Sequence, residues 1–183
     1  MDAALEVFQA RGFNGSSVQD LTDAAGVPKG SFYNHFESKE ELALAALSIY
    51  VSQHGIEVLS DPKFEPLERL KRHFRANWKV VRERGYQSGC LLGSLSSEMA
   101  DTHEVARAEF ASYFHEWSVE IAKVIGQAQA AGTISDLIDR RAAGRFVLNA
   151  WQGTLIRAKV TKDEEAFKDF LALVFGVILA PKR

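Results

Sequence analysis

Apolar residues recur at helical spacing along almost the whole chain, and the alternating pattern of a strand is nearly absent. Near the start, the pattern predicts a short helix over residues 3–11. Leu5 and Phe8 face inward in this helix, and Gly12 ends it. The same periodicity continues to the last residues, so we expect an all-α protein.

The next two helices are predicted from their end signals. Ser17 and Asp20 have the spacing of a capping box, in which each side chain satisfies a free backbone N–H at the start of a helix. That helix stops at Gly26. Pro28 suits a first helical position because its missing N–H costs nothing there, so we predict another short helix over residues 28–36.

Longer helices are predicted after this point. Ser38 and Glu41 repeat the capping spacing and open a helix to about Leu59. Further helices are predicted at residues 67–84, at 88–101, at 103–130, at 135–159, and from 161 or 163 to just before 181. The chain thus divides into a small helical domain at 1–48 and a longer helical domain at 49–183.

The two helices joined by Gly26 and Val27 match a helix-turn-helix, whose second helix enters the DNA major groove. Phe32 and Phe36 stand four residues apart and should face the core. The remaining side chains can hydrogen-bond to base edges and phosphates. They are Lys29, Ser31, Tyr33, Asn34 and His35. A solvated helix within a bundle is the simpler alternative.

Composition and charge add limits. The chain is 46% hydrophobic and 25% charged with a net charge of −2, which is ordinary for a globular protein and gives no general attraction to DNA. Residues 1–48 carry three basic and seven acidic side chains, which opposes DNA binding unless the charges lie on different faces. A single cysteine excludes an internal disulfide and fits a cytoplasmic setting. We see no leader sequence and no apolar run of membrane-spanning length.

The stretch GFNGSSVQDLTDAAGVPKGSFYNHFESKEEL, residues 12–42, resembles the DNA-binding domain of the TetR family of transcriptional regulators. The turn, the Tyr-x-His-Phe run and the Ser-Lys-Glu cap all fall in register over residues 3–48. The resemblance implies that Ser17 contacts a phosphate and that Lys39 binds the DNA backbone. It also implies a groove-facing surface made of Lys29, Gly30, Ser31, Tyr33, Asn34 and His35.

The last two predicted helices carry wide apolar stripes. The resemblance implies a four-helix interface between two copies, and a homodimer would place two recognition helices about one DNA turn apart on a palindrome. Domain core is the alternative. The residues concerned are Phe146, Ala150, Phe167, Phe170, Leu171, Val174 and Ile178.

Aromatic side chains are frequent in the middle helices. Apolar walls with few polar groups are typical of small-molecule sites, although aromatic residues at helical spacing also form ordinary cores. The candidate effector-binding residues are Phe74, Trp78, Phe110, Phe114, Trp117, Asn149 and Trp151.

The segments SGCLLGSLSSE (88–98) and NAWQGTLIRAKV (149–160) resemble the electrophile-sensing branch of the TetR family, typified by the repressor of N-ethylmaleimide reductase. The resemblance implies that Cys90 senses electrophiles or oxidants and that Lys159 lies near it. A neighbouring ammonium favours the reactive thiolate, and so does the helix start at which Cys90 is predicted. The alternative is that Cys90 is a small buried hydrophobic residue.

Motifs of catalysis and metal binding are missing from the sequence. The five histidines never have His-Glu-x-x-His spacing, and we find no P-loop and no Gly-x-Ser-x-Gly elbow. We therefore expect no enzyme, cofactor or metal. The sequence predicts a repressor that binds operator DNA as a homodimer and is released by a small molecule. A helical small-molecule-binding module without DNA function is the alternative.

Overall fold

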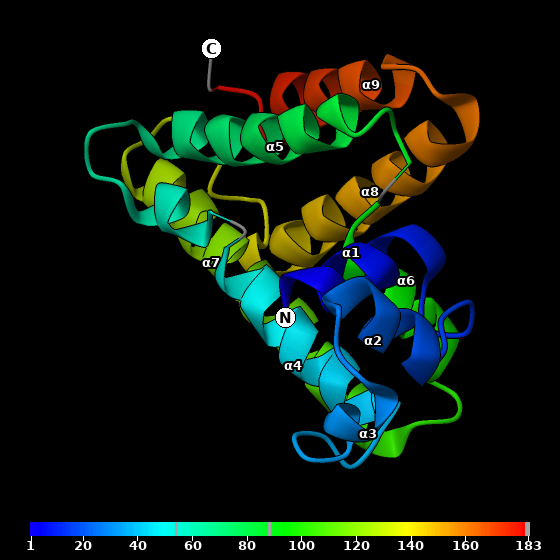
Figure 1. The fold of residues 1–183 in the computed structure, drawn as a ribbon. Coiled ribbons are helices and arrows are strands. Elements are labelled where there is room, and N and C mark those ends of the chain that lie inside the picture. The colour runs from blue at the N-terminus through cyan, green and yellow to red at the C-terminus, as the bar shows by residue number, and fades with distance from the viewer. Residues whose placement is uncertain (54, 88, 182–183) are drawn as a thin grey trace. The chain divides into compact units, whose positions relative to one another are not determined.

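The computed structural model describes residues 1–53, 55–87 and 89–181. These residues form nine α-helices, a 3-10 helix and a π-helical segment (Figure 1). The single strand-like pairing in this described part is a bridge between Ile134 and Pro181, so the all-α prediction is confirmed. The chain divides into two compact units, Met1–Gln53 with Ser88–Tyr113, and His54–Gln87 with Phe114–Arg183.

The first unit consists of five helices and the start of α7 (Glu104–Ala130). The five are α1 (Asp2–Arg11), α2 (Val18–Ala25), α3 (Lys29–Phe32), α4 (Lys39–Ser52) and α6 (Leu91–Met99). Leu5 and Phe8 are buried in α1, as predicted, and Gly12 ends this helix with a positive φ of 72°. Burial of one apolar stripe per helix is the main force that holds these short helices together.

Serine caps fix where α2 and α4 begin. The Ser17 Oγ accepts a hydrogen bond from the Asp20 N–H (3.1 Å), and the Asp20 carboxylate accepts one from the Ser17 N–H (2.8 Å), so the predicted capping box is confirmed. Hydrogen bonds from the Ser17 hydroxyl and N–H hold the pKa of Asp20 below its ordinary value. Ser38 likewise caps the Glu41 N–H (3.1 Å), but the Glu41 carboxylate accepts from the N–H of Glu37 (2.7 Å), one residue before the cap.

Two helices are shorter than predicted. Beyond Phe32 the backbone makes i→i+3 hydrogen bonds from Asn34 and His35, so α3 becomes a tight turn, and Pro28 precedes the helix as its cap. The helix predicted to reach Leu59 ends at Ser52 instead. A left-handed Gly55 (φ 63°) then starts a separate 3-10 helix, η1 (Ile56–Ser60).

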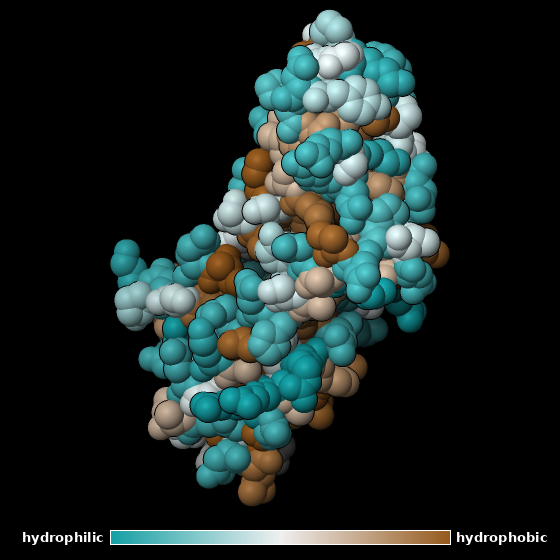
Figure 2. All heavy atoms as spheres, turned by 90° about the horizontal axis from the view of Figure 1, so that it is seen from below, coloured by the Kyte–Doolittle hydropathy of each residue, from teal (hydrophilic) through white to brown (hydrophobic). Residues whose placement is uncertain are grey.

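By length and composition alone, residues 39–60 are apolar enough to cross a membrane, contrary to the sequence prediction that no such run exists. In the described part of this stretch, residues 39–52 form a core helix and residues 56–60 form a separate 3-10 helix. α4 buries Leu42, Ala43, Ala46 and Leu47 within the first unit. On the face of the molecule seen in Figure 2, hydrophilic residues predominate and hydrophobic ones lie scattered among them.

The second unit contains η1, α5 (Pro66–Glu83), the rest of α7, α8 (Arg140–Thr161), α9 (Glu165–Leu173) and the π-helical η2 (Val174–Ile178). Its core is aromatic. Trp78 and Phe167 stack with ring centroids 4.5 Å apart, and Phe74 lies 5.1 Å from Trp151 and 4.9 Å from Phe170. These contacts join α5, α8 and α9, and α5 and α9 run side by side in Figure 1.

The start of α8 lies later than the predicted Ser135, because Asp139 is the residue that caps it. The Asp139 carboxylate accepts hydrogen bonds from the N–H groups of Ala142 (2.9 Å) and Arg141 (2.8 Å). These bonds hold the pKa of Asp139 below its ordinary value. The start of α8 is thus fixed by one carboxylate.

The absence of a side chain at Gly144 lets α8 pack closely against α7. A Cβ at this position would lie 2.5 Å from the Ser118 carbonyl oxygen and 3.0 Å from the Ala122 Cβ. Both separations are below normal van der Waals contact, and the first involves backbone that cannot move independently of α7. Gly153, on the same helix, has nothing within 4 Å of its Cβ position.

We expect Gly144→Ala to destabilise the protein by about 1–3 kcal/mol, because the added methyl group must push α7 and α8 apart. Gly153→Ala is the matched control, and it should be neutral or stabilising by up to about 1 kcal/mol, as alanine is the better helix former. Urea unfolding of the two variants and the parent protein measures both. Equal stability of the two variants would contradict the tight crossing.

Candidate functional site

The polar side chains on and after α3 lie at the surface of the first unit. Tyr33 is 61% exposed, while its neighbour Phe32 is 5% exposed and packs edge-on against the Tyr33 ring with centroids 5.1 Å apart. Phe32 therefore anchors the turn and leaves the tyrosine hydroxyl free to meet a partner. The exposed predicted DNA-contacting residues here are Lys29, Gly30, Tyr33, Asn34 and His35, and Ser31 is half-buried.

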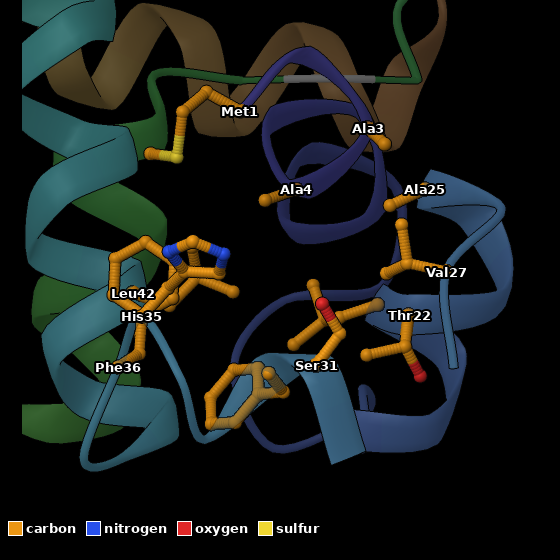
Figure 3. Close-up of a pocket in the computed structure, with 12 residues that line it drawn as sticks. Met1, Ala3, Ala4, Thr22, Ala25, Val27, Ser31, His35, Phe36 and Leu42 are labelled. Carbon is orange, nitrogen blue, oxygen red and sulfur yellow. The ribbon is translucent and has the colours of Figure 1, made fainter. Parts of the chain in front are cut away.

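A cavity of about 180 Å³ lies beside this surface, lined by residues of α1, α2, α3, α4 and the turn after α3. Figure 3 shows His35 turned toward this cavity from the side opposite Val27, with Met1 and Ala4 above. Ser31 also lines it, whereas Lys29, Tyr33 and Asn34 do not. Two of the predicted DNA-contacting residues, Ser31 and His35, therefore face the cavity, and the others on this surface do not.

Ser17 is exposed at the start of α2, as the predicted phosphate contact requires. Its hydroxyl donates to the Asp20 carboxylate (2.5 Å) and accepts from the Asp20 N–H. Asp20 is also paired with Arg11 at 2.7 Å. The start of α2 thus presents a serine whose hydroxyl is oriented by an aspartate, close to one arginine.

Lys39 is held by the turn between α1 and α2. Its ammonium donates hydrogen bonds to the carbonyl oxygens of Phe13 and Ser16, both at 2.8 Å, and lies 4.1 Å from the centre of the Phe13 ring. Burial lowers the pKa of Lys39, and the charge of Glu98 acts in the opposite direction. Two of the three N–H donors of the ammonium are therefore used inside the protein, and one is left for the predicted backbone contact.

Glu98, on α6, is a residue of this network that sequence reasoning missed. Its carboxylate accepts a hydrogen bond from the Asn14 N–H (2.6 Å) in the same turn. Asn14 and Glu98 are 84 positions apart, so no local pattern could have indicated the contact. The side chains of Lys39 and Glu98 together satisfy backbone groups on both sides of the turn that precedes Ser17.

Most lysine and arginine side chains of the first unit already bind other groups of the protein. Arg11 pairs with Asp20, and Arg107 lies 3.7 Å from Glu104. Lys39 faces the turn. Among the residues that the structure describes, Lys29 has no ion-pair partner, and it is exposed. Lys29 is consequently the cation best placed to meet a phosphate.

The predicted effector residues do not form one group. Phe74, Trp78 and Trp151 belong to the aromatic core of the second unit, and Trp117 is also buried there. Phe114 is half-buried and Asn149 is exposed, whereas Phe110 is buried in the first unit.

A buried polar pair lies within this aromatic region. The Trp117 indole N–H donates to His73 Nε2 at 3.1 Å, and His73 Nδ1 lies 3.2 Å from the Gly55 carbonyl oxygen. An indole N–H can only donate, so Nε2 must accept and the proton must sit on Nδ1. His73 therefore acts as the acceptor in its hydrogen bond with Trp117. It orients the indole of Trp117, one of the predicted effector residues.

Cys90 is buried, with 5% exposure, and occupies the N-cap position of α6 in the first unit without a side-chain cap hydrogen bond. Its carbonyl oxygen accepts from the Ser94 N–H at 2.9 Å. Lys159 is exposed in the last turn of α8 in the second unit. The helix-start position predicted for Cys90 is confirmed, and its pairing with Lys159 stays a prediction.

The apolar stripe on α9 and η2 mostly faces the core of its own chain. Phe167, Phe170 and Val174 are at most 8% exposed and pack within the second unit, so most of their surface is covered by their own chain. Of the predicted interface residues, Phe146 is 53% exposed, and Ala150, Leu171 and Ile178 are half-buried. Other large apolar side chains are exposed on α8 (Ile156 and Val160), at the end of α9 (Leu173) and on η2 (Val177).

Comparison with known families gives matches over most of the chain. The family model described as "Bacterial regulatory proteins, tetR family" matches residues 1–46. The family model described as "Tetracyclin repressor-like, C-terminal domain" matches residues 66–174. The chain is 36% identical to the HTH-type transcriptional repressor DhaR of Mycobacterium sp. (strain GP1), over 98% of this chain and 90% of DhaR. It is 27% identical to the HTH-type transcriptional repressor NemR of Escherichia coli (strain K12), over 93% of this chain and 87% of NemR.

Solved structures show the same fold. The regulatory protein TetR from Rhodobacter sphaeroides aligns with a TM-score of 0.88 at 28% identity, covering 94% of this chain and 93% of that one. The reduced form of Escherichia coli NemR aligns with a TM-score of 0.84 at 23% identity, covering 96% and 95%, which supports the fold alone. The described helices therefore have known counterparts over nearly their whole length.

We expect Lys39→Met to destabilise the first unit by about 1–3 kcal/mol, because it leaves the carbonyl groups of Phe13 and Ser16 without their donor. Lys29→Met removes an exposed ammonium and should change stability by less than about 0.5 kcal/mol. Thermal unfolding followed by circular dichroism compares the two. If Lys39→Met unfolds at the same temperature as Lys29→Met, the two hydrogen bonds contribute nothing to folding.

Proposed function

The chain belongs to the TetR family of bacterial transcriptional regulators, and from this premise we propose that it is a repressor released from operator DNA by a small molecule. Its N-terminal part is a helix-turn-helix DNA-binding domain, and its C-terminal part is a ligand-binding domain of the family's type. Members of this family regulate transcription and are not enzymes. Their operation on DNA fits the cytoplasmic setting expected from the single cysteine.

The observation that carries the proposal is the exposed surface at α3. Asn34 and the Tyr33 hydroxyl are hydrogen-bonding groups of the kind that contact base edges, and Lys29 is an exposed cation beside them. Ser17 stands exposed at the start of α2, where its hydroxyl is oriented by Asp20 and lies close to Arg11, which pairs with the same carboxylate. Backbone contacts would come from Ser17, Lys29 and the free donor of Lys39. Base contacts would come from the predicted groove-facing residues other than the buried Phe32, which are Lys29, Gly30, Ser31, Tyr33, Asn34 and His35.

A homodimer is the form in which we propose that this surface acts. Phe146, Ile156 and Val160 on α8, with Leu173 and Val177 near the C-terminus, expose apolar side chains to solvent. Exposed apolar residues that gather on neighbouring helices are typical of a subunit interface. Two copies related by a two-fold axis would hold two recognition helices for the two halves of a palindromic operator.

The effector is proposed to act on the second unit and on α6. The aromatic residues around Trp78, Trp117 and Trp151 supply apolar walls, and Asn149 supplies a polar group. For Cys90 the proposal is narrower, because it stands at the N-cap position of α6, where the helix dipole favours a thiolate. The thiolate would add to the β-carbon of a quinone or enal. A C–S bond forms, and the resulting enolate takes a proton from water.

DNA binding is tested by footprinting and anisotropy on the DNA that flanks the protein's own gene. We expect Asn34→Ala to weaken operator binding by about tenfold or more. Lys29→Met should weaken binding to all sequences and reduce the slope of log K against log salt by about 1. Lys63→Met, which removes an exposed lysine of the second unit, is the matched control and should change neither quantity.

Absence of a footprint, or identical binding by Lys29→Met and Lys63→Met, would overturn the assignment of this surface. Such a result, together with saturable binding of a small apolar ligand, would favour the alternative of a helical binding module without DNA function.

The dimer is tested by sedimentation experiments. A dimer that dissociates when Phe146→Glu is introduced would support the proposed interface. A monomeric parent protein bound to a full palindrome would contradict it.

Sensing by Cys90 is tested by release from operator DNA in the presence of a quinone. Because Cys90 is the single cysteine, one adduct in the intact mass spectrum identifies the reacting thiol. We expect the quinone to release the parent protein but not Cys90→Ser, and Lys159→Met to react more slowly. The corresponding hydroquinone, which cannot accept a thiolate, is the control. Release of Cys90→Ser to the same extent would remove the thiol from the mechanism.

A further inference from the structure

A cationic cleft of about 550 Å³ lies in the second unit between α7 and the first turns of α8. Its volume is in the range of small-molecule sites, and it is separate from the aromatic residues proposed for the effector. α7 contributes His115, Ser118 and Lys123, and α8 contributes Arg140, Arg141 and Arg145. Four of these side chains are lysine or arginine, so the cleft is cationic.

The charges of the cleft are only partly compensated. Lys123 pairs with Glu120 at 2.6 Å, and Asp139 lies close enough to Arg141 and Arg145 for their charges to lower the pKa of its carboxyl group. Among the described residues, no carboxylate lies within ion-pair distance of Arg140, Arg141 or Arg145. The Asp139 oxygen is itself engaged by two N–H groups of the helix start. Several guanidinium donors therefore remain available to a bound anion.

The packing of the two helices fixes this arrangement. Gly144 brings α8 against Ser118 and Ala122, which places Arg141 and Arg145, one turn apart on α8, beside the same stretch of α7. Arg140 lies over α7 at Gly126, where a Cβ would be 2.8 Å from its Nη1 atom. The side chains that line the cleft thus come from a rigid helix crossing. A site built on such an element loses less freedom when it binds a ligand.

Like charges held this close to one another repel, and the arrangement becomes favourable when an anion lies between them. Guanidinium groups present planar pairs of N–H donors that match the oxygen atoms of phosphate. Because Asp139 already occupies the free N–H groups of α8, the helix start is not what would hold the anion. Recognition would depend on the three arginine side chains, with Lys123 adding charge.

We propose that this cleft binds a phosphate-bearing small molecule. Arg141 and Arg145 donate hydrogen bonds to the phosphate oxygens, and Arg140 forms the wall of the cleft that lies over Gly126 of α7. The multiple positive charges favour a dianion or a more highly charged group over a single carboxylate. The proposal does not depend on DNA binding or on Cys90. It adds a second ligand site to the domain in which the effector is expected.

Isothermal titration with pyrophosphate tests the proposal on the full chain in the absence of DNA, at a constant ionic strength set with potassium chloride. We expect saturable binding, weakened about tenfold or more by Arg141→Gln and by Arg145→Gln. Arg157→Gln removes an exposed arginine of the same helix outside the cleft, and it should bind like the parent protein. Thermal unfolding of each variant shows that it is folded.

Three results would overturn the proposal. The first is the absence of saturable binding at millimolar pyrophosphate, and the second is equal binding by the parent protein, Arg141→Gln and Arg145→Gln. The third is tighter binding of malonate than of pyrophosphate, which would assign the cleft to carboxylates. If one arginine variant does not fold, the other gives the same comparison. Since no operator is present in this assay, its outcome is independent of the outcome of footprinting.

Discussion

The turn between α1 and α2 contains peptide groups that neither helix can pair, and side chains from two later helices satisfy them. The ammonium of Lys39 on α4 binds two carbonyl oxygens of this turn, and the carboxylate of Glu98 on α6 binds its Asn14 N–H. The turn leads directly into the Ser17 cap of α2. The position of α2, and through it that of α3, therefore depends on these few charge-assisted hydrogen bonds.

This constraint also connects the DNA-facing helices to a segment that lies far along the sequence. α6 begins after Cys90 and carries Glu98 in its last turn, so the two ends of one nine-residue helix meet the proposed sensing thiol and the turn before Ser17. A second link runs from α7 to α4, where the Ala106 N–H donates to Glu40 at 3.3 Å. A change at the start of α6 thus has a short, rigid path to the recognition surface.

Features set by neighbouring residues were predicted well from the sequence, and features set by distant contacts were not. The Ser17 cap depends on a side chain three residues away, so its sequence spacing was sufficient. Lys39 was predicted as a DNA contact from the family resemblance, and nothing in the sequence shows that its ammonium also binds the carbonyl groups of Phe13 and Ser16. The stripe through Phe167 and Phe170 was identified as apolar, but periodicity cannot tell a core from an interface.

The near absence of unpaired cations in the first unit has a consequence for how the protein finds its target in the cell. Nonspecific binding to chromosomal DNA comes almost wholly from ammonium and guanidinium groups that displace the counterions of the phosphates. With Lys29 as the one unpaired lysine or arginine among the described residues of that unit, such binding would be weak. Most copies would then diffuse freely between encounters, and occupancy of the correct site would respond quickly to changes in the number of copies.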